Sequence, residues 1–537
     1  MFRSAHIDSF PRDNLPPREQ WPDLIFTLPE LHYPERLNCA AEFVDRHVVA
    51  GRGRRPAVAA PDGTQWTYAD FAAQVNRIAN VLTGELGMVP GNRVLLRAAN
   101  TPMMLASYFA VIKAGGVAVA TMPLLRAKEL QFIAEKARID LALCDRRLGQ
   151  EIERLPEGTL ARAVHFNAPG APDELERMMA AASPDFAACD TAQDDVCLIA
   201  FTSGTTGVPK GTMHFHRDML AICDTFSRHV LRPVADDVFA GSAPLAFTFG
   251  LGAIVLFAFH ACASCLLLEK TAPADLLDAV RTYHPTILST SPTGYRMMLH
   301  GLDPADVASL RACVSAGETL PKATWEAWHA ATGLKLIDGI GGTEMLHIFI
   351  SAAGDEIRPG ATGKPVPGYE AKVVDEDGRQ APPGTVGRLA VRGPTGCRYL
   401  ADARQTQFVQ GGWNLTGDTY VMDEDGYFWY QARADDMIVS SGYNIAGPEV
   451  ENALLTHPAV LECAVVGAPD PERGQIVAAY VVPRAGVVCD ETLTKVLQEH
   501  VRASIAPYKY PRAIAYVEAL PRTATGKIQR FALRNPN

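Results

Sequence analysis

One stretch of the sequence, residues 201–211, combines the groups that bind phosphate in proteins. It reads FTSGTTGVPKG; an apolar run at 196–201 predicts a buried strand before it, and residues 214–230 have helical spacing after it. Glycine lets the backbone approach a ligand closely, and hydroxyl and lysine groups donate hydrogen bonds to phosphate oxygens. The candidate donors are Thr202, Ser203, Thr205, Thr206 and Lys210. A surface turn can share this composition, and the spacing is not that of a Walker A loop. The ordered pattern nevertheless predicts a nucleotide-binding loop.

Further polar, glycine-rich segments follow other predicted strands. In DGIGGTEM, at 338–345, a carboxylate beside a polyphosphate would be repelled unless a cation lay between them, so Glu344 is a candidate Mg²⁺ ligand. In WNLTGD, Asp418 could accept hydrogen bonds from two ribose hydroxyls. SAGETLP, at 315–321, fits a plain helix cap as well as a ligand site. PRTATGK, at 521–527, predicts by itself only a solvated lysine in a turn.

The elements that must position these segments alternate between strand and helix along most of the chain. From residue 64 to residue 338 this alternation predicts parallel β/α architecture. After Gly368 the strands become short and are separated by Pro/Gly/Asp turns, which predicts a small β-barrel. A charged segment at 433–436 then precedes an α+β region. We therefore expect an α/β protein with an N-terminal AMP-binding domain of β/α subdomains plus a small β-barrel at 1–433, and a small mobile α+β lid domain at 434–537.

Composition narrows the class of protein. A chain of 537 residues is too long for one core. The net charge of −10 gives no electrostatic attraction for nucleic acid or anionic membrane, so neither is expected as a partner. Eleven scattered cysteines, including the isolated Cys262/Cys265 pair, suggest a reducing compartment and buried thiols. The N-terminus lacks the apolar core of a signal peptide, and the apolar run at 249–268 is interpreted as a buried helix, turn and strand. We expect a cytoplasmic protein.

Taken together, the motifs resemble those of the adenylate-forming superfamily of acyl-CoA synthetases, adenylation domains and luciferases. FTSGTTGVPKG, GIGGTE, WNLTGD, ARADDMIVSSGYNI and RTATGK match that family in order and spacing over essentially the whole chain. FTFGLG, SAGETLP and DGIGGTEMLHIF look like benzoate-type aryl-CoA ligases. DNLPPREQWP, LNCAAE and TMPLLRAKEL look most like the 2-aminobenzoate-CoA ligase branch.

The resemblance implies a two-step ligase that uses ATP, Mg²⁺ and CoA. A carboxylate displaces pyrophosphate from ATP to give an acyl-adenylate, and the CoA thiol then displaces AMP. The implied phosphate ligands are Thr202, Ser203, Gly204, Thr205, Thr206 and Lys210, with Thr343 at the α-phosphate and Glu344 on the metal. The implied nucleoside contacts are Gly317, Glu318, Asp338 and Ile340 at the adenine and Asp418 and Arg433 at the ribose. Lys527 would stabilise charge that develops during adenylation.

The resemblance also implies a hinge, a thiol path and an acyl pocket. Asp435 falls at the hinge position, and Gly442 and Tyr443 fall along the pantetheine tunnel. The residues at acyl-pocket positions are Thr248, Phe249, Gly341, Leu346, His347 and Ile348. Two positions depart from the family: Ala432 replaces the usual glycine before Arg433, and Asn444 stands where Arg or Gln is common. The expected acid is 2-aminobenzoate or benzoate.

Other functions remain as alternatives at this point. They are a medium-chain fatty acyl-CoA ligase, a free-standing adenylation enzyme that loads a carrier protein, a phosphotransferase and a catalytically silent nucleotide-binding module. The missing Walker pattern disfavours a phosphotransferase. Glu344, Asp418 and Lys527 together disfavour a silent module, because binding alone would not need Lys527. The sequence leaves the oligomeric state open, with a homodimer as one option.

Overall fold

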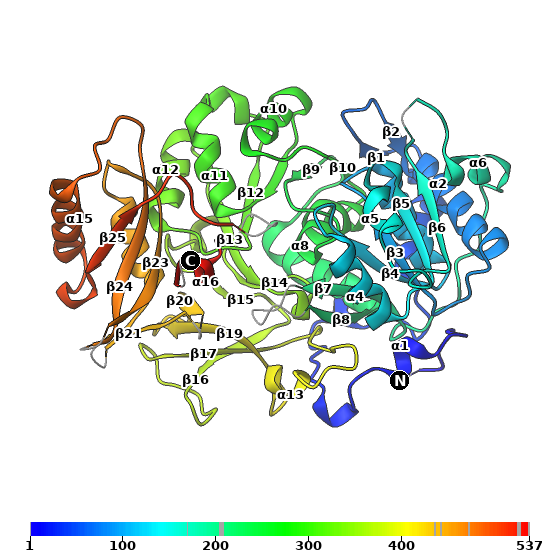
Figure 1. The fold of residues 1–537 in the computed structure, drawn as a ribbon. Helices are drawn as coiled ribbons and strands as arrows, with labels where there is room; N and C mark the ends of the chain where they lie inside the picture. The colour runs from blue at the N-terminus through cyan, green and yellow to red at the C-terminus, as the bar shows by residue number, and fades with distance from the viewer. Residues whose placement is uncertain are drawn as a thin grey trace.

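The computed structural model describes residues 2–168, 170–202, 209–433, 436–440, 443–470, 473–522 and 528–534. These residues form four β-sheets. In Figure 1, two large sheets with their helices make the body, an antiparallel sheet lies along its lower edge, and a C-terminal domain lies at one side. The predicted α/β class, with a β/α body and a C-terminal α+β domain, is confirmed. The part predicted as a small barrel is an open half-barrel sheet.

The first large sheet carries the predicted nucleotide loop. Its six strands have the order β6-β5-β3-β4-β7-β8. They are β3 (Arg93–Arg97), β4 (Val117–Thr121), β5 (Leu141–Asp145), β6 (Arg162–Phe166), β7 (Val196–Thr202) and β8 (Lys210–Phe215). Their pairing is parallel except between β7 and β8. Helices cover both faces of such a sheet, which explains why β3 and β4 are buried along their whole length.

The start of the helix after the loop was predicted wrongly. Residues 210–215 form β8, antiparallel to β7, and the helical segments α7 (His216–Ile222) and η7 (Cys223–Leu231) begin only at His216. The reason is the pairing itself, which matches Thr202 with Lys210 and Phe201 with Gly211. The loop therefore joins two neighbouring antiparallel strands, and its two ends lie opposite each other.

The second large sheet supplies two more of the polar loops, SAGETLP at the end of β12 and the loop after β13 that carries Thr343 and Glu344. Its nine strands have the order β15-β14-β13-β12-β11-β9-β10-β1-β2. They are β1 (Pro56–Ala59), β2 (Gln65–Thr67), β9 (Val238–Gly241), β10 (Ser264–Leu266), β11 (Ile287–Thr290), β12 (Ala312–Ala316), β13 (Leu336–Gly341), β14 (Ile348–Ser351) and β15 (Lys364–Pro365). The six strands from β13 to β1 are parallel, so their carboxyl ends meet at one edge. Ligands of open α/β sheets bind at that edge.

The apolar run at 249–268 is core, as predicted. It forms α8 (Thr248–Gly250), η8 (Leu251–Leu256), α9 (Phe257–His260) and then β10. The side chains of Leu251, Ile254, Phe257 and Phe259 are almost fully buried. Among the described residues, no helix is long and apolar enough to span a membrane.

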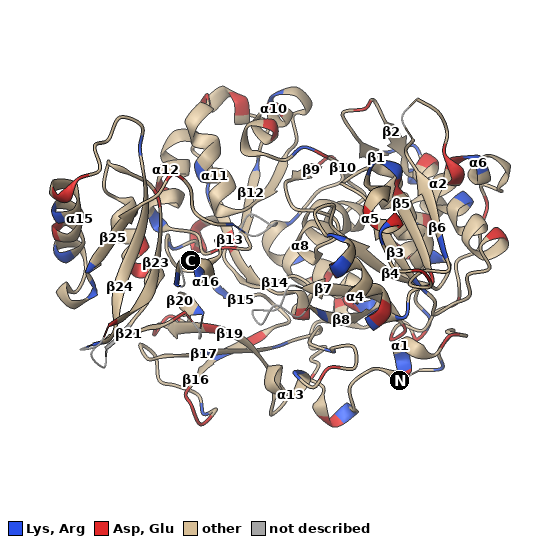
Figure 2. Ribbon diagram, viewed as in Figure 1, with Lys and Arg blue, Asp and Glu red and all other residues tan. Residues whose placement is uncertain are grey.

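Two smaller sheets complete the chain. The half-barrel contains β16 (Glu370–Val374), β17 (Val386–Arg392), β18 (Val409–Gln410), β19 (Trp413–Met422) and β20 (Phe428–Arg433). The C-terminal domain contains β21 (Ile438–Ser440), β22 (Tyr443–Ile445), β23 (Val460–Asp470), β24 (Gly474–Pro483) and β25 (Ala513–Tyr516), with α14 (Gly447–Leu455), α15 (Glu491–Ser504) and α16 (Arg530–Arg534). In Figure 2, basic and acidic residues are interspersed over these two sheets, and neither sign gathers in one place, which favours binding of any anionic ligand by local groups.

Candidate active site

The phosphate loop is described only at its two ends. Thr202 ends β7 and Lys210 begins β8, and the two are cross-strand partners with half-buried side chains. Ser203, Gly204, Thr205 and Thr206 lie outside the described residues. The predicted hydroxyl and ammonium donors Thr202 and Lys210 therefore lie side by side at one end of the sheet.

Lys210 and the predicted metal ligand Glu344 meet through a tyrosine that the motifs did not identify. The hydroxyl of Tyr399 donates to Glu344 Oε1 at 2.5 Å, and Lys210 Nζ donates to the same hydroxyl at 3.3 Å. Burial and the neighbouring carboxylate raise the pKa of Tyr399. Tyr399 therefore remains a donor and fixes one oxygen of the carboxylate. Proteins commonly hold Mg²⁺ with a single oriented carboxylate, while phosphate oxygens and water complete the coordination of the ion.

The backbone carbonyl of Thr343 is held by a buried network of one neutral and two charged side chains. His214 Nε2 donates to the Thr343 carbonyl at 2.8 Å. Its other ring nitrogen faces Asp218 Oδ2 at 3.8 Å, and Asp218 binds Arg398. All three side chains are fully buried. Burial alone would raise the pKa of Asp218, but the Arg398 guanidinium holds it below its usual value. Burial lowers the pKa of His214, so the imidazole is neutral.

The predicted adenine contacts come together at the ends of two neighbouring strands. Ser315 and Ala316 of β12 pair with Asp338 and Gly339 of β13. Gly317 follows with a φ of +91°, a conformation that favours glycine. The Glu318 carboxylate accepts the backbone amide and hydroxyl of Thr293 at 3.2 and 2.7 Å. Ile340, near the end of β13, is half-buried. The structure therefore brings Gly317, Glu318, Asp338 and Ile340 into one region.

Asp338 has an unusual environment for a carboxylate. Its Oδ1 is buried and has no hydrogen-bond partner among the described residues, and a cavity of about 10 Å³ adjoins it. Burial raises the pKa of Asp338 to about 7. Above neutral pH the ionised carboxylate predominates and is a strong acceptor for a hydrogen bond, such as one from an adenine amino group, whereas the protonated form is a weaker acceptor and carries one donor.

The predicted ribose ligands form a cross-strand pair. Asp418 of β19 faces Arg433 of β20, and Arg433 Nη1 lies 3.1 Å from Asp418 Oδ1. Gly417 has a φ of +78°, and a β-carbon there would lie 3.1 Å from Arg433 Nη2. Glycine at 417 therefore lets the guanidinium approach the loop.

Aromatic rings surround the predicted acyl-pocket residue His347. Its ring centroid lies 5.5 Å from that of Phe249, 4.6 Å from that of Phe257 and 5.7 Å from that of Phe226. Neither ring nitrogen has a hydrogen-bond partner among the described residues, and burial lowers the pKa of His347 to about 3. The imidazole is therefore neutral and has one donor and one acceptor without a described protein partner.

Backbone geometry fixes the turn that carries His347. Leu346 is buried with a φ of +70°, which is strained for a non-glycine residue. A β-carbon on Gly341 would lie 2.7 Å from the His347 carbonyl oxygen. A β-carbon on Gly252, which the motifs did not single out, would lie 2.4 Å from the imidazole ring. The remaining predicted pocket residues, Thr248 and Ile348, are buried nearby in α8 and β14.

Several predicted residues cannot be placed. Lys527, Asp435 and Gly442 lie outside the described residues. Tyr443 begins β22, but the position of its side chain is not described. Their roles therefore remain predictions.

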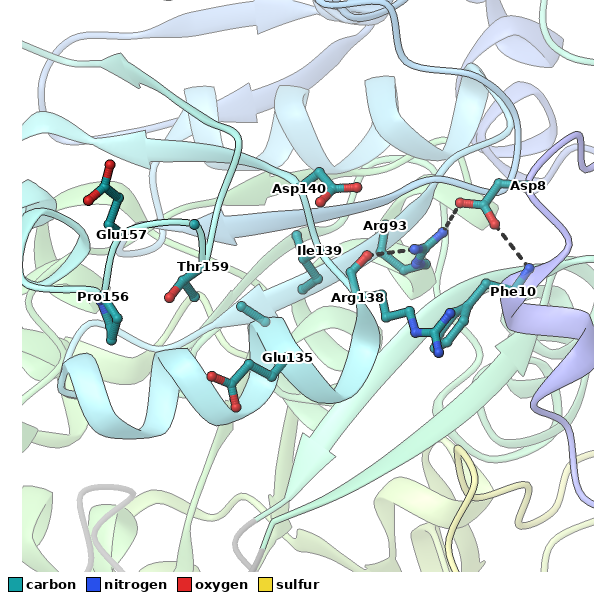
Figure 3. Close-up of a pocket in the computed structure, with 12 residues that line it drawn as sticks. Asp8, Phe10, Arg93, Glu135, Arg138, Ile139, Asp140, Pro156, Glu157 and Thr159 are labelled. Carbon is teal, nitrogen blue, oxygen red and sulfur yellow. Dashed lines mark hydrogen bonds and ion pairs between the residues drawn. The ribbon is translucent and has the colours of Figure 1, made fainter.

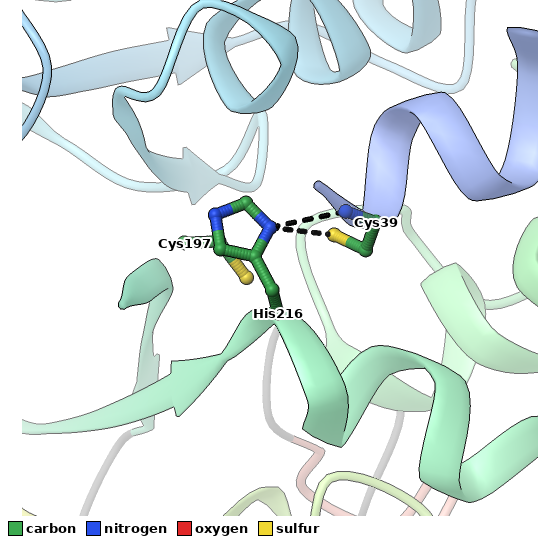
Figure 4. Close-up of side chains that lie close together, drawn as sticks. All are labelled: Cys39, Cys197 and His216. Atoms are coloured by element: carbon green, nitrogen blue, oxygen red, sulfur yellow. Dashed lines mark hydrogen bonds between the residues drawn. The ribbon is translucent and has the colours of Figure 1, made fainter. Parts of the chain in front are cut away.

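Two other features of the molecule lie apart from this constellation. Cys39, Cys197 and His216 form a buried cluster in which Cys39 Sγ and its backbone amide both lie 3.2 Å from His216 Nδ1 (Figure 4). Thiols do not suit Mg²⁺, which prefers oxygen ligands.

A cavity of about 630 Å³ near the N-terminus contains Asp8 bound to Arg93, together with Glu135, Asp140 and Glu157 (Figure 3). These carboxylates would repel a polyphosphate.

Comparison with known proteins identifies the family to which the chain belongs. The model of the AMP-binding enzyme family matches residues 45–399, and that of the AMP-binding enzyme C-terminal domain matches residues 449–527. A benzoate–CoA ligase from Thauera aromatica is 37% identical over 519 residues, covering 95% of this chain and 98% of that protein. The chain belongs to the AMP-binding enzyme family. It is an acid–thiol ligase of the AMP-forming acyl-CoA synthetase type.

Two solved structures are also similar over nearly their whole length. The anthranilate CoA ligase AuaEII in complex with anthranoyl-AMP has a TM-score of 0.89 and 35% identity, covering 94% of this chain and 98% of that chain. A benzoate CoA ligase from Burkholderia xenovorans LB400 has a TM-score of 0.85 and 32% identity, covering 93% of this chain and 100% of that chain. The adenylate-forming fold and the use of ATP and CoA thus characterise this family.

Replacing Glu344 tests the proposed metal contact. Glu344→Gln keeps the acceptor for Tyr399 but removes the charge, so adenylation should fall by about 10²-fold or more, the size of effect of losing one preorganised electrostatic group. Pyrophosphate release across a Mg²⁺ titration measures this. Tyr399→Phe is the matched control, because it frees the carboxylate and leaves its charge. Near-normal release by Glu344→Gln at all Mg²⁺ concentrations would contradict the assignment.

The raised pKa of Asp338 predicts a pH dependence of ATP binding. Below about pH 7 the carboxyl group is protonated and loses the negative charge that makes it a strong acceptor, so the KM for ATP should rise as the pH falls from 8 to 6. Asp338→Asn should flatten this dependence, because an amide does not titrate. Steady-state kinetics at saturating acid and CoA give the two profiles. Parallel profiles for the two proteins would show that Asp338 does not contact the nucleotide.

Proposed function

We propose that this acyl-CoA ligase acts on an aromatic acid, with 2-aminobenzoate as the preferred substrate and benzoate as the second candidate. The observation that carries the proposal is the buried, neutral imidazole of His347. It lies among aromatic side chains, and neither of its ring nitrogens has a hydrogen-bond partner among the described residues. An ortho-amino group needs an acceptor, and a neutral imidazole provides one. The similarity to an anthranilate (2-aminobenzoate) CoA ligase and to benzoate CoA ligases supports the same class of acid.

The walls of the pocket favour a flat ring over an alkyl chain. Phe249 provides an apolar face beside His347, and glycine at 341 lets the chain pack directly against the backbone of His347, which holds the imidazole in place. A long chain would need a tunnel, which Phe247 and Phe249 are placed to close. The hydroxyl of Thr248 offers a second hydrogen-bond acceptor in the same region. Its role and that of the His347 imidazole must therefore be separated by experiment.

In the proposed reaction, a carboxylate oxygen of the acid attacks the α-phosphorus of ATP and the bond to pyrophosphate breaks. Thr202 and Lys210 bind the departing phosphates, and the Asp418–Arg433 pair orients the ribose. Glu344 would hold Mg²⁺, and the charge of the ion would offset that of the phosphates. The CoA thiol then attacks the acyl carbon, the bond to AMP breaks and the thioester forms. Asp435 is the proposed hinge between a body at 1–433 and a lid at 434–537, and Gly442 and Tyr443 lie on the proposed thiol path.

A panel of acids tests the substrate directly. We expect kcat/KM to be highest for 2-aminobenzoate, then benzoate, with octanoate far lower, measured by pyrophosphate release with and without CoA. His347→Phe keeps an aromatic ring but removes the acceptor, so the preference for 2-aminobenzoate over benzoate should fall about 10-fold, the value of one hydrogen bond. Thr248→Val is the matched variant for the competing acceptor.

The outcomes of this panel separate the alternatives. A preference of the wild-type protein for octanoate would indicate a medium-chain ligase. Pyrophosphate release without any thioester product from CoA would indicate an enzyme that loads a carrier protein. If Thr248→Val rather than His347→Phe changes the ratio, the acceptor is Thr248.

Lys527 and Asp435 should affect different half-reactions. Lys527→Ala should slow acyl-adenylate formation about 10²–10³-fold, as expected for loss of a preorganised charge at a developing oxyanion, and hardly affect thioester formation from supplied acyl-adenylate. Asp435→Pro fixes φ at the hinge and should do the reverse. Pyrophosphate release and thioester formation measure the two steps. Equal effects of both variants on both steps would contradict domain alternation.

A further inference from the structure

A ring of charged and polar side chains crosses from the body to the C-terminal domain. Arg296, on α11 (Pro292–Met298) of the body, donates to Glu462 Oε1 on β23 at 2.7 Å. Arg522 of the C-terminal domain donates to both oxygens of Glu462 at 3.0 and 3.1 Å. Arg522 also reaches back to the body, where its Nη1 lies 3.8 Å from Glu318 Oε1. Positive and negative groups therefore alternate across the boundary.

Helix α11 closes this ring. Thr293 donates its backbone amide and hydroxyl to Glu318. Arg296 is three residues further along the same helix, a spacing that places two side chains on one face. Through this ring the body contacts the C-terminal domain at Arg296 and at Glu318, both joined to the first turns of one short helix.

The burial of these groups makes the ring more than a surface ion pair. The side chains of Arg296, Glu462, Arg522 and Glu318 are 18%, 12%, 24% and 17% exposed. Hydrogen bonds to charged groups in such partly desolvated places are stronger than exposed ion pairs, which contribute little. A rotation of the C-terminal domain that separated Glu462 from Arg296 would also move Arg522 relative to Glu318. The two contacts across the boundary should therefore form and break together.

The position of the ring connects it to the chemistry. Glu318 belongs to the region predicted to contact adenine, and Arg522 directly precedes residues 523–527, which carry Lys527. We propose that Arg296 and Glu462 are positioning residues that hold the C-terminal domain in the orientation required for acyl-adenylate formation, so that breaking their contact favours the thioester step. This inference rests on the two-step reaction proposed above. It goes beyond that reaction by naming residues of this chain that set the balance between the domain orientation for acyl-adenylate formation and the orientation for the thioester step.

Replacing the two residues should shift that balance in a measurable direction. Arg296→Ala and Glu462→Gln each remove a charge-assisted hydrogen bond, so acyl-adenylate formation should fall about 10- to 100-fold. Thioester formation from supplied 2-aminobenzoyl-adenylate and CoA should stay the same or become faster. Arg296→Lys restores a positive donor and should recover part of the first rate. Single-turnover rates of pyrophosphate release and of thioester formation give the two values for each protein.

Matched controls separate positioning from simple loss of stability. Arg281→Ala breaks an ion pair with Asp278 and Asp306 that lies wholly within the body, and Glu449→Gln breaks the pair with Lys509 within the C-terminal domain. Both controls should leave the ratio of the two half-reactions unchanged.

The outcomes are distinct from those that test the overall function. A wild-type protein that makes no acyl-adenylate from any acid would refute the proposed function. A working wild-type protein whose Arg296→Ala and Glu462→Gln variants slow both steps equally, or neither, would refute the positioning role. Faster adenylation with slower thioester formation would show that the ring stabilises the opposite orientation.

Discussion

A buried ion pair between Arg398 and Asp218 connects segments of the body that belong to different sheets. Asp218 lies on α7, directly after the strand that begins with Lys210, and Arg398 lies between β17 and β18 of the half-barrel. His214 links the same pair to the turn at Thr343. The Arg398 guanidinium also lies 4.0 Å from the ring centroid of Phe215. Removing one partner of such a fully buried pair leaves an uncompensated charge and costs about 3–5 kcal/mol.

The geometry of the active site depends on this buried ion pair. Tyr399 is the next residue after Arg398, so fixing the guanidinium also fixes the phenol that orients Glu344 and contacts Lys210. The neutral His214 fixes the carbonyl of Thr343 at the same time. An acidic protein with a net charge of −10 can thereby present a lysine and an oriented carboxylate at one point without relying on an overall positive field.

The order of the elements and the position of the polar loops could be predicted from the sequence, because strand and helix periods are local. The start of the helix after the loop could not, since residues 210–215 become a strand only by pairing with β7. Arg398 and Tyr399 were missed for a related reason: their partners are 180 and 55 residues away along the chain. Gly252 was missed because only the folded chain shows His347 against it.

The most direct test of the account is a single turnover with wild-type protein, ATP, Mg²⁺ and 2-aminobenzoate in the absence of CoA, followed by addition of CoA. The account predicts that 2-aminobenzoyl-adenylate and pyrophosphate form in equal amounts on the enzyme before CoA is added. It predicts that added CoA then converts the adenylate to thioester and AMP. Release of inorganic phosphate and ADP, or thioester formation with no acyl-adenylate at any time, would contradict it.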